Sequence, residues 1–334
     1  MTVVTGKEAG EKVELSPMSK SLRAAVIGVG YLGRFHAQKY AALPDVELVG
    51  VVDPNPERAA AVARELGTAA FASHAELAGK VDLVSIASTT ESHYRIARDC
   101  LAAGLHVLVE KPITVTVAEA DELIALADAG KRMLQVGHLE RYNPAWLAVR
   151  DKIATPLFIE AHRMAPFKPR GTDVSVVLDL MIHDLDLILP LVKSPIADLR
   201  ASGVAVLTEG IDIANARIEF ASGCVANITA SRASTASLRR MRIFQHHEYL
   251  SVDFGERKIG VAKKRDSIIE GEPPIDSESR IEPPGDALLS EIQAFVASVR
   301  GETIPGGTCT GRDGREALAV ALEIERLMLK QGKQ

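Results

Sequence analysis

The strongest constraint on the fold is a regular alternation of short apolar segments with helical segments between Leu22 and Gly137. The predicted strands are Arg23–Gly28, Val46–Asp53, Ala69–Phe71, Val81–Ala87, Val107–Val109 and Met133–Gly137. The predicted helices between them are Leu32–Leu43, Glu57–Leu66, His93–Ala103 and Ala118–Ala129. Strands and helices of these lengths alternate in βαβ units, whose right-handed crossovers build a parallel sheet. The first part of the chain is therefore predicted to be an α/β domain.

A glycine-rich turn follows the first predicted strand and opens the first helix. Gly28 to Gly33 reads Gly-Val-Gly-Tyr-Leu-Gly, the GxGxxG pattern of a doubly wound, dinucleotide-binding Rossmann fold. The first glycine permits the tight turn, the second lets a pyrophosphate approach the backbone, and the third allows close helix–strand packing. The free N–H groups and the partial positive charge at the helix N-terminus favour binding of the phosphates. A tight turn without a ligand is the alternative. The predicted cofactor-binding residues of this turn are Gly28, Gly30, Tyr31, Leu32 and Gly33.

Asp53, at the end of the second predicted strand, bears on the choice between NAD and NADP. A carboxylate accepts hydrogen bonds from the ribose hydroxyls of NAD. It would repel a 2′-phosphate by about 1–4 kcal/mol per unit charge at about 4 Å, depending on screening. The sequence therefore favours NAD over NADP. The alternative is a helix-capping role for Asp53 before Pro54 and Pro56.

A second polar signal lies where a buried strand ends. Val107–Val109 is followed directly by a carboxylate, an amine and a proline, Glu110-Lys111-Pro112. In an open α/β sheet the crevice outside the carboxyl ends of the strands binds ligands. A lysine there can reach a ligand, whereas a lysine inside the strand would be buried at high cost. Glu110-Lys111-Pro112 is therefore predicted to lie at the same edge of the sheet as the glycine turn, where it forms a candidate active site.

The pattern changes after about Pro144, and we expect a second domain of the α+β class. One apolar helix, Val174–Val192, precedes a series of strand-like segments that indicate a mainly antiparallel open sheet. Arg265–Asp286 is predicted to be a surface loop, and helices are expected at Leu288–Val299 and Arg315–Lys330. The expected organisation is a disordered extension over 1–20, a Rossmann domain over 21–143, and a substrate and oligomerisation domain over 144–334, whose last helix packs back on the Rossmann domain.

The apolar helix carries a polar stripe. Asp179, His183 and Asp186 are spaced i, i+4 and i+7, which places them on one helix face. A hydrogen bond donated by His183 to the Asp179 carboxylate would raise the pKa of His183 and prepare it as a general base. Two alternatives remain open, a structural Asp–His network at a domain interface and a metal site. No cysteine or second histidine lies at ligand spacing in this helix, so no metal is predicted.

Taken together, these motifs resemble the glucose–fructose oxidoreductase / inositol dehydrogenase / MocA family over nearly the whole chain. The resemblance implies hydride transfer with NAD, with Lys111 and His183 beside the reacting carbon and Asp179 touching the substrate or orienting His183. It implies a homodimer or homotetramer formed through the C-terminal sheet. It also implies further residues around the cofactor, which are Ser88, Thr90, His93, Glu110 and Lys111.

A finer similarity comes from three segments, Gly137–Pro144, Leu178–Asp184 and Cys224–Arg232. They resemble the branch of the family that oxidises the 3-hydroxyl of UDP-N-acetylglucosamine to a 3-keto sugar, a step toward precursors of lipid A. A diphosphate needs cationic donors, preferably arginine. The predicted substrate-binding residues are Arg141, Asn143, Arg163 and Arg170. For each of these arginines, a solvated surface charge is an equal alternative.

Composition excludes several other classes of protein. The 334 residues carry a net charge of −5 without a basic block, which argues against nucleic-acid binding. No apolar run reaches a membrane span, and three isolated cysteines favour a reducing compartment, the cytoplasm. Two rival functions remain, an inositol or free-sugar dehydrogenase and a non-catalytic NAD-binding regulatory protein. The presence of both Lys111 and His183 argues against the second rival.

Overall fold

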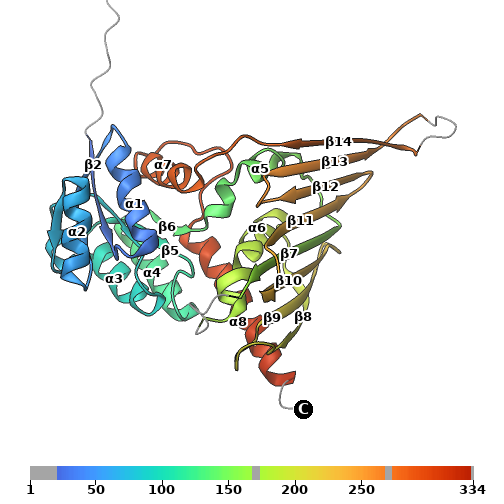
Figure 1. The fold of residues 1–334 in the computed structure, drawn as a ribbon, viewed down its shortest axis with the longest axis horizontal. Helices are drawn as coiled ribbons and strands as arrows, with labels where there is room; N and C mark the ends of the chain where they lie inside the picture. The colour runs from blue at the N-terminus through green and yellow to red at the C-terminus, as the bar shows by residue number, and fades with distance from the viewer. Residues whose placement is uncertain (1–20, 168–173, 268–272, 332–334) are drawn as a thin grey trace, which may run out of the picture.

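The computed structural model describes residues 21–167, 174–267 and 273–331, which form two β-sheets with their helices (Figure 1). The predictions for residues 1–20 and for Arg170 lie outside these ranges. The N-terminal sheet is parallel throughout, with the strand order β3-β2-β1-β4-β5-β6. Its strands are β1 (Leu22–Ile27), β2 (Val46–Val52), β3 (Ala69–Phe71), β4 (Leu83–Ile86), β5 (His106–Glu110) and β6 (Leu134–Gly137).

This sheet is doubly wound. Its helices are α1 (Tyr31–Ala42), α2 (Pro56–Leu66), α3 (Thr90–Ala102) and α4 (Val117–Gly130). The central strands β4 and β5 are short, apolar and almost wholly buried, as expected for strands covered on both faces. The strand order reverses between β1 and β4, and a reversal of this kind opens a ligand crevice at the carboxyl ends. The predicted Rossmann fold is confirmed.

The C-terminal sheet has eight strands in the order β14-β13-β12-β11-β7-β10-β9-β8. Strands β7 and β10 pair in parallel, and the other neighbours pair antiparallel. The strands are β7 (Phe158–Pro166), β8 (Ile196–Val204), β9 (Ile213–Phe220), β10 (Val225–Ser234), β11 (Leu238–Gln245), β12 (Glu248–Asp253), β13 (Lys258–Lys264) and β14 (Ile275–Ile281). This arrangement confirms the prediction of a mainly antiparallel sheet.

Helices cover the side of this sheet that faces the N-terminal domain (Figure 1). They are α5 (Pro144–Leu147), a π-helical turn (Val177–Met181), α6 (Ile182–Val192) and α8 (Gly311–Gln331). Inward-facing strand residues such as Ile159, Ile228 and Ile243 pack against Leu185 and Ile188 of α6. The core of the second half therefore lies directly behind the polar residues of α6.

The last two helices contact the N-terminal half as well. Helix α7 (Ala287–Val299) packs beside α1 and buries Ile292 and Phe295 in the core below it. Helix α8 buries Leu318 against the N-terminal sheet and Ile324 against the C-terminal one. The chain end thus fixes the two sheets relative to each other across the crevice.

Two expectations for the second half are wrong. Part of the predicted loop Arg265–Asp286 forms the edge strand β14, which pairs with β13 although all seven of its residues are exposed. The helix predicted over Val174–Val192 is a π-helical turn followed by α6, so its polar residues do not follow one regular helix face. Within the described ranges, no helix combines the length and hydropathy needed to cross a membrane.

Candidate active site

The glycine turn leaves backbone groups free to meet a ligand. Gly28 has a φ of 83°, and a Cβ on Gly33 would lie 1.8 Å from the Gly28 oxygen, so neither position accepts a larger residue. A Cβ on Gly30 would meet Arg58 at 3.7 Å and little else. Gly30 begins α1 without a side-chain cap, which leaves its first N–H groups available to phosphates. These features fit a pyrophosphate at the turn.

A cleft of ≈ 520 Å³ opens beside this turn and is lined by Gly28, Gly30, Asp53, Arg58 and Ser88 among others. Asp53 accepts hydrogen bonds from the Val29 N–H at 3.0 Å and from the Asn55 N–H at 2.8 Å. The side chain that caps α2 is Asn55, so Asp53 is not the capping residue. The guanidinium of Arg58 lies 3.8 Å from the Asp53 carboxylate. The Arg58 side chain therefore borders the cleft.

The segment after β4 connects the cleft to the end of β5. Ser88 bonds to Ser92 through its hydroxyl, and Thr90 begins α3. His93 is 1% exposed, with its ring nitrogens 2.9 Å from the Pro112 oxygen and 3.1 Å from the Ser88 oxygen. Burial lowers the pKa of His93. His93 therefore holds the Glu110-Lys111-Pro112 segment at the carboxyl edge, and its predicted contact with a cofactor stays a prediction.

Lys111 joins the two halves of the protein at this edge. Its Nζ donates to the Asp179 carbonyl oxygen at 2.8 Å and lies 3.4 Å from the Asp179 carboxylate. The Lys111 side chain is 19% exposed and that of Asp179 is 47% exposed. The π-helical turn supplies Asp179, so this irregular turn is what brings the carboxylate to the lysine. The ion pair is accessible from the crevice.

His183 lies next to this ion pair at the start of α6. The residue is partly exposed, but its Nδ1 is buried without a hydrogen-bond partner in the described part of the chain. Burial and the nearby charges of Lys111, Arg163 and Arg239 hold the pKa of His183 well below its usual value. The sequence interpretation expected Asp179 to raise this pKa, and that expectation is wrong because the surrounding charges are cationic. A neutral imidazole is ready to accept a proton.

Glu110 turns inward behind Lys111. It is 6% exposed, and its carboxylate lies 2.9 Å from Nε2 of His36. Glu291 of α7 is fully buried nearby, and neither of its oxygens has a partner within the described ranges. Burial, followed by the Glu110 charge, raises the pKa of Glu291 well above its usual value. Burial and the Glu110 charge therefore both favour the protonated form of Glu291.

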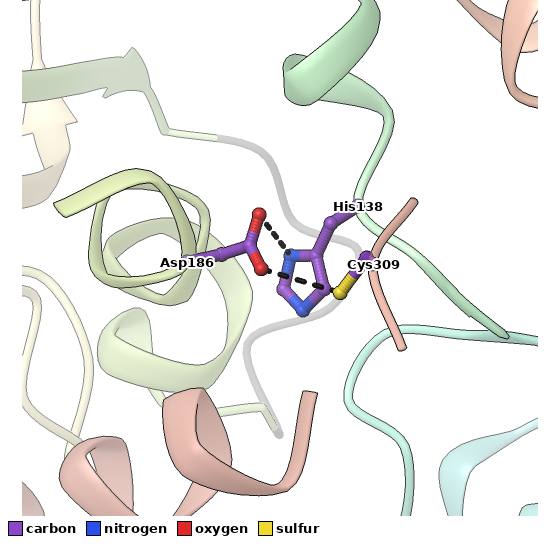
Figure 2. Close-up of side chains that lie close together, drawn as sticks. All are labelled: His138, Asp186 and Cys309. Carbon is purple, nitrogen blue, oxygen red and sulfur yellow. Dashed lines mark hydrogen bonds and ion pairs between the residues drawn. The ribbon is translucent and has the colours of Figure 1, made fainter. Parts of the chain in front are cut away.

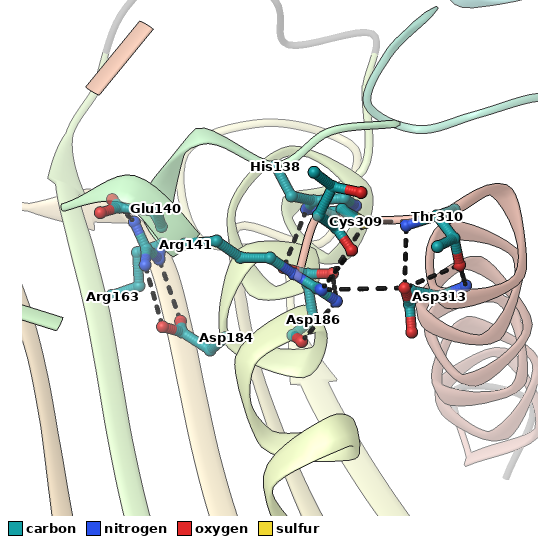
Figure 3. Close-up of polar contacts among 10 residues, drawn as sticks. His138, Glu140, Arg141, Arg163, Asp184, Asp186, Cys309, Thr310 and Asp313 are labelled. Carbon is teal, nitrogen blue, oxygen red and sulfur yellow. Dashed lines mark hydrogen bonds and ion pairs between the residues drawn. The ribbon is translucent and has the colours of Figure 1, made fainter. Parts of the chain in front are cut away.

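Two of the predicted substrate residues, Arg163 and Asn143, take part in an internal network, and Figure 3 shows the contacts of Arg163. Arg163 is 4% exposed and donates to both Asp184 oxygens at 3.0 and 2.9 Å and to Glu140 at 2.8 Å. Asn143 donates to Glu140 at 3.2 Å. The network ties β7 to α6 and to the turn after β6. A substrate contact for Arg163 or Asn143 stays a prediction, and the observed partners are all protein groups.

Arg239 adds an exposed cation to this network. Its guanidinium lies 3.1 Å from Glu140, and its side chain is 44% exposed. The Arg239 charge also lowers the pKa of His183. Arg239 lies on the same side of β11 as the buried Met241. This side faces the helices, at the rim of the crevice.

Arg141 lies deeper, in a second cluster (Figures 2 and 3). Its guanidinium donates to both Asp186 oxygens at 2.7 Å. The Cys309 thiol donates to Asp186 at 3.3 Å, and Nδ1 of His138 lies 3.8 Å from the same carboxylate. Burial alone would raise the pKa of Asp186, but His138 and Arg141 outweigh it and hold this pKa below its usual value. Asp186 is therefore ionised and neutralised by Arg141.

His138, Asp186 and Cys309 are donor types that bind metals, and their atoms lie within 4.8 Å of one another. Two features argue against a cation here. Arg141 occupies both Asp186 oxygens and would face the ion, and burial together with Asp186 raises the pKa of Cys309 well above its usual value. The alternative of a metal site on Asp179, His183 and Asp186 is not supported either, because Asp179 contacts Lys111 while Asp186 contacts Arg141. We therefore assign Asp186 and Cys309 to a hydrogen-bonded network with Arg141, which His138 borders.

Sequence reasoning missed His138 and Glu291, and each left a signal. His138 directly follows β6, so it leaves the sheet at the same carboxyl edge as Lys111. Glu291 interrupts an apolar helix face that includes Leu288, Ile292 and Phe295. The resulting site offers a neutral histidine and an ammonium at one crevice, beside a turn built for phosphates. This arrangement suits removal of a hydroxyl proton next to a bound dinucleotide.

Comparison with known proteins agrees with this geometry. Residues 22–138 match the model of the oxidoreductase family with an NAD-binding Rossmann fold, and residues 147–249 match the GFO/IDH/MocA C-terminal domain. UDP-N-acetylglucosamine 3-dehydrogenase of Acidithiobacillus ferrooxidans is 43% identical over 91% of this chain and 96% of its own. Its solved structure superposes with a TM-score of 0.86, covering 93% of this chain and 98% of that one.

More distant relatives act on inositols. An inositol 2-dehydrogenase of Rubrobacter xylanophilus is 32% identical over 50% of this chain and 51% of its own. A scyllo-inositol dehydrogenase of Lactobacillus casei, solved with NAD(H) and scyllo-inositol, is 20% identical and shares the fold with a TM-score of 0.77, covering 93% of this chain and 98% of that one. The fold, the crevice and both domain matches lead to one assignment: this chain belongs to the GFO/IDH/MocA family of oxidoreductases.

Proposed function

We propose that the protein oxidises the 3-hydroxyl of UDP-N-acetylglucosamine to a ketone, with NAD as the hydride acceptor. The observation that carries this proposal is the Lys111–Asp179 ion pair beside His183, at the carboxyl edge of a dinucleotide-binding sheet. The choice of sugar rests on the relative that shares 43% of its residues along nearly the whole chain.

The roles of the residues follow from their positions. When bound, NAD supplies the nicotinamide carbon that accepts the hydride. His183 takes the hydroxyl proton at Nε2, since its Nδ1 is buried. The Lys111 ammonium stabilises the negative charge that develops on the same oxygen. Asp179 holds Lys111 in place through its carbonyl and carboxylate oxygens.

The glycine turn and Asp53 support NAD as the cofactor. The free N–H groups at the start of α1 fit a pyrophosphate, and each Asp53 oxygen keeps a lone pair for a ribose hydroxyl after bonding Val29 and Asn55. A 2′-phosphate would meet the Asp53 charge, although Arg58 lies 3.8 Å away and would partly offset it. We therefore propose NAD rather than NADP.

The sugar and its diphosphate need a cation that is free to meet them. Arg163 is buried and the Arg141 side chain is only 13% exposed, and both are held in ion pairs, whereas Arg239 is 44% exposed at the crevice rim. We place the diphosphate near Arg239. This placement departs from the sequence prediction, which named Arg141, Asn143, Arg163 and Arg170.

The test is absorbance at the reduced-nicotinamide band while purified protein is mixed with UDP-N-acetylglucosamine and either NAD or NADP. We expect turnover with NAD at least about tenfold above that with NADP, and a loss of about 10²-fold or more in His183→Ala. His246→Ala, which removes an exposed histidine, serves as the matched control and keeps the wild-type rate.

The rival functions give different results in the same assay. Activity on an inositol or a free sugar, without activity on UDP-N-acetylglucosamine, would keep the reaction class and discard the substrate. NAD binding without oxidation of any polyol would favour a regulatory protein. Thermal stabilisation by UDP alone separates the first rival from our proposal, because a ligand stabilises the fold that binds it. The three free cysteines support a reducing compartment, and we propose the cytoplasm.

A further inference from the structure

The base in the proposed reaction lies in an unfavourable position for a positive charge. The charged groups facing His183 are Lys111 from the β5 edge, Arg163 from β7 and Arg239 from β11, and His138 faces it from the turn after β6. Each of these charges opposes protonation, and so does burial. A proton taken from the sugar therefore has to leave His183 for the site to remain a good acceptor.

The buried side of His183 points to a route for that proton. Its Nδ1 is buried and has no partner among the described residues, and buried polar atoms of this kind are uncommon. The ring of His138 lies against it, edge to face, with 6.0 Å between the centroids. His138 is 1% exposed, and both of its nitrogens also lack hydrogen-bond partners within the described ranges. Two neighbouring imidazoles thus have nitrogens that no described residue uses, and a water molecule bridging them would satisfy both.

The surroundings of His138 suit a positive charge better than those of His183. The ionised Asp186 lies 3.8 Å from its Nδ1, and Glu110 adds a second negative charge. Figure 2 shows the Asp186 carboxylate facing the His138 ring. Arg141 and Lys111 are the opposing cations. Burial lowers the pKa of His138 too, but Asp186 counteracts the effect, whereas the charges of Lys111, Arg163 and Arg239 add to the effect of burial at His183. Transfer from His183 to His138 therefore moves the proton toward its counter-ion.

We propose that His138 is a positioning residue that receives the substrate proton through His183, with Asp186 as its counter-ion. The substrate O–H bond breaks as an N–H bond forms at Nε2 of His183. The Nδ1–H bond of His183 then breaks as its proton passes to a bridging water molecule, and that water gives up another of its protons to form an N–H bond on His138, which leaves the water and His183 neutral. The hydride goes to NAD, so the electrons balance without a further reactant. This relay rests on the proposed function, in which His183 is the base.

The test compares single-turnover hydride transfer across pH in wild type, His138→Asn and Cys309→Ser. In His138→Asn we expect the rate at pH 7 to fall about 10²-fold and to rise steeply with pH, because hydroxide replaces the missing acceptor. The KM for the sugar and the Kd for NAD should stay within about twofold, since the relay assigns His138 no contact with either ligand. Cys309→Ser keeps the hydrogen bond to Asp186 and should retain the wild-type rate and pH profile.

Other outcomes would overturn the relay. A His138→Asn variant with the wild-type pH profile shows that the proton leaves His183 by another route. Stoichiometric zinc in the wild type that is lost from Cys309→Ser would make the cluster a metal site instead. If His138→Asn unfolds, a proton inventory on wild-type hydride transfer decides: a curved plot supports two moving protons, and a straight plot overturns the relay. Inactivity of the wild type toward UDP-N-acetylglucosamine would refute the proposed substrate but not the relay. The comparison of wild type, His138→Asn and Cys309→Ser is then run with the polyol that the wild type does oxidise. A wild type that oxidises no polyol overturns both the relay and the proposed function.

Discussion

At the scale of single residues, Arg239 and Arg240 allow a sharp test of where the diphosphate binds. They are adjacent on β11 and so point to opposite faces of the sheet, with Arg239 at the crevice rim and Arg240 paired with Asp253. We expect Arg239→Gln to raise the KM for UDP-N-acetylglucosamine about tenfold or more, because a charge-assisted contact is lost. Arg240→Gln should leave that KM unchanged. Steady-state kinetics with NAD saturating gives both values, and equal effects of the two variants would refute the placement.

Some of the site residues could be located from the sequence, whereas the contacts between them could not. Gly28, Asp53 and Lys111 were predictable because each sits at a fixed offset from a strand end, so a one-dimensional pattern locates it. The contacts of Asp186 were not, because Arg141, His138 and Cys309 approach it from separate parts of the chain. The pKa of His183 was misjudged for the same reason: Arg163 and Arg239 come from strands distant in sequence.

At the scale of elements, the ion pairs between β7 and α6 are expected to fix the catalytic helix. Arg163 and Asp184 form a bidentate pair with side chains 5% and 3% exposed. Asp184→Asn leaves a buried guanidinium with less compensation and should lower the free energy of unfolding by about 3–5 kcal/mol. Asp198→Asn breaks a far more exposed pair with Arg200 and should cost less than about 1 kcal/mol. Urea unfolding of both variants measures the difference, and similar losses would show that burial of the pair does not matter.

Elements were predictable to different degrees. Strands β1, β4 and β5 are apolar runs buried on both faces, so composition alone indicates them. Strand β14 has no such signal, because its residues are exposed and its conformation depends on backbone pairing with β13. The π-helical turn before α6 is likewise set by its tertiary surroundings and not by residue spacing.

At the scale of the whole molecule, we expect two or four chains to assemble through the outer face of the C-terminal sheet. This face carries a row of partly exposed aromatic rings. The ring centroids of Phe158 and Phe244 lie 6.0 Å apart, and those of Phe244 and Tyr249 lie 5.0 Å apart. Aromatic side chains with a polar surround are typical of interfaces, and the ion pair between Arg242 and Glu160 borders the row. Helices cover the opposite face of the sheet (Figure 1), so the outer face remains for a partner.

Light scattering after size exclusion should therefore give two or four times the 35.8 kDa of one chain. Phe244→Glu places a charge in the aromatic row and should yield the single-chain mass with NAD binding intact, because the cofactor cleft lies in the other domain. Val206→Glu is the control, because it also places a charge at an exposed apolar residue. Val206 is 57% exposed beyond the end of edge strand β8, and this variant should leave the assembly unchanged. If Val206→Glu dissociates the protein and Phe244→Glu does not, copies meet at the β8 edge, and the aromatic row belongs to a surface without a partner.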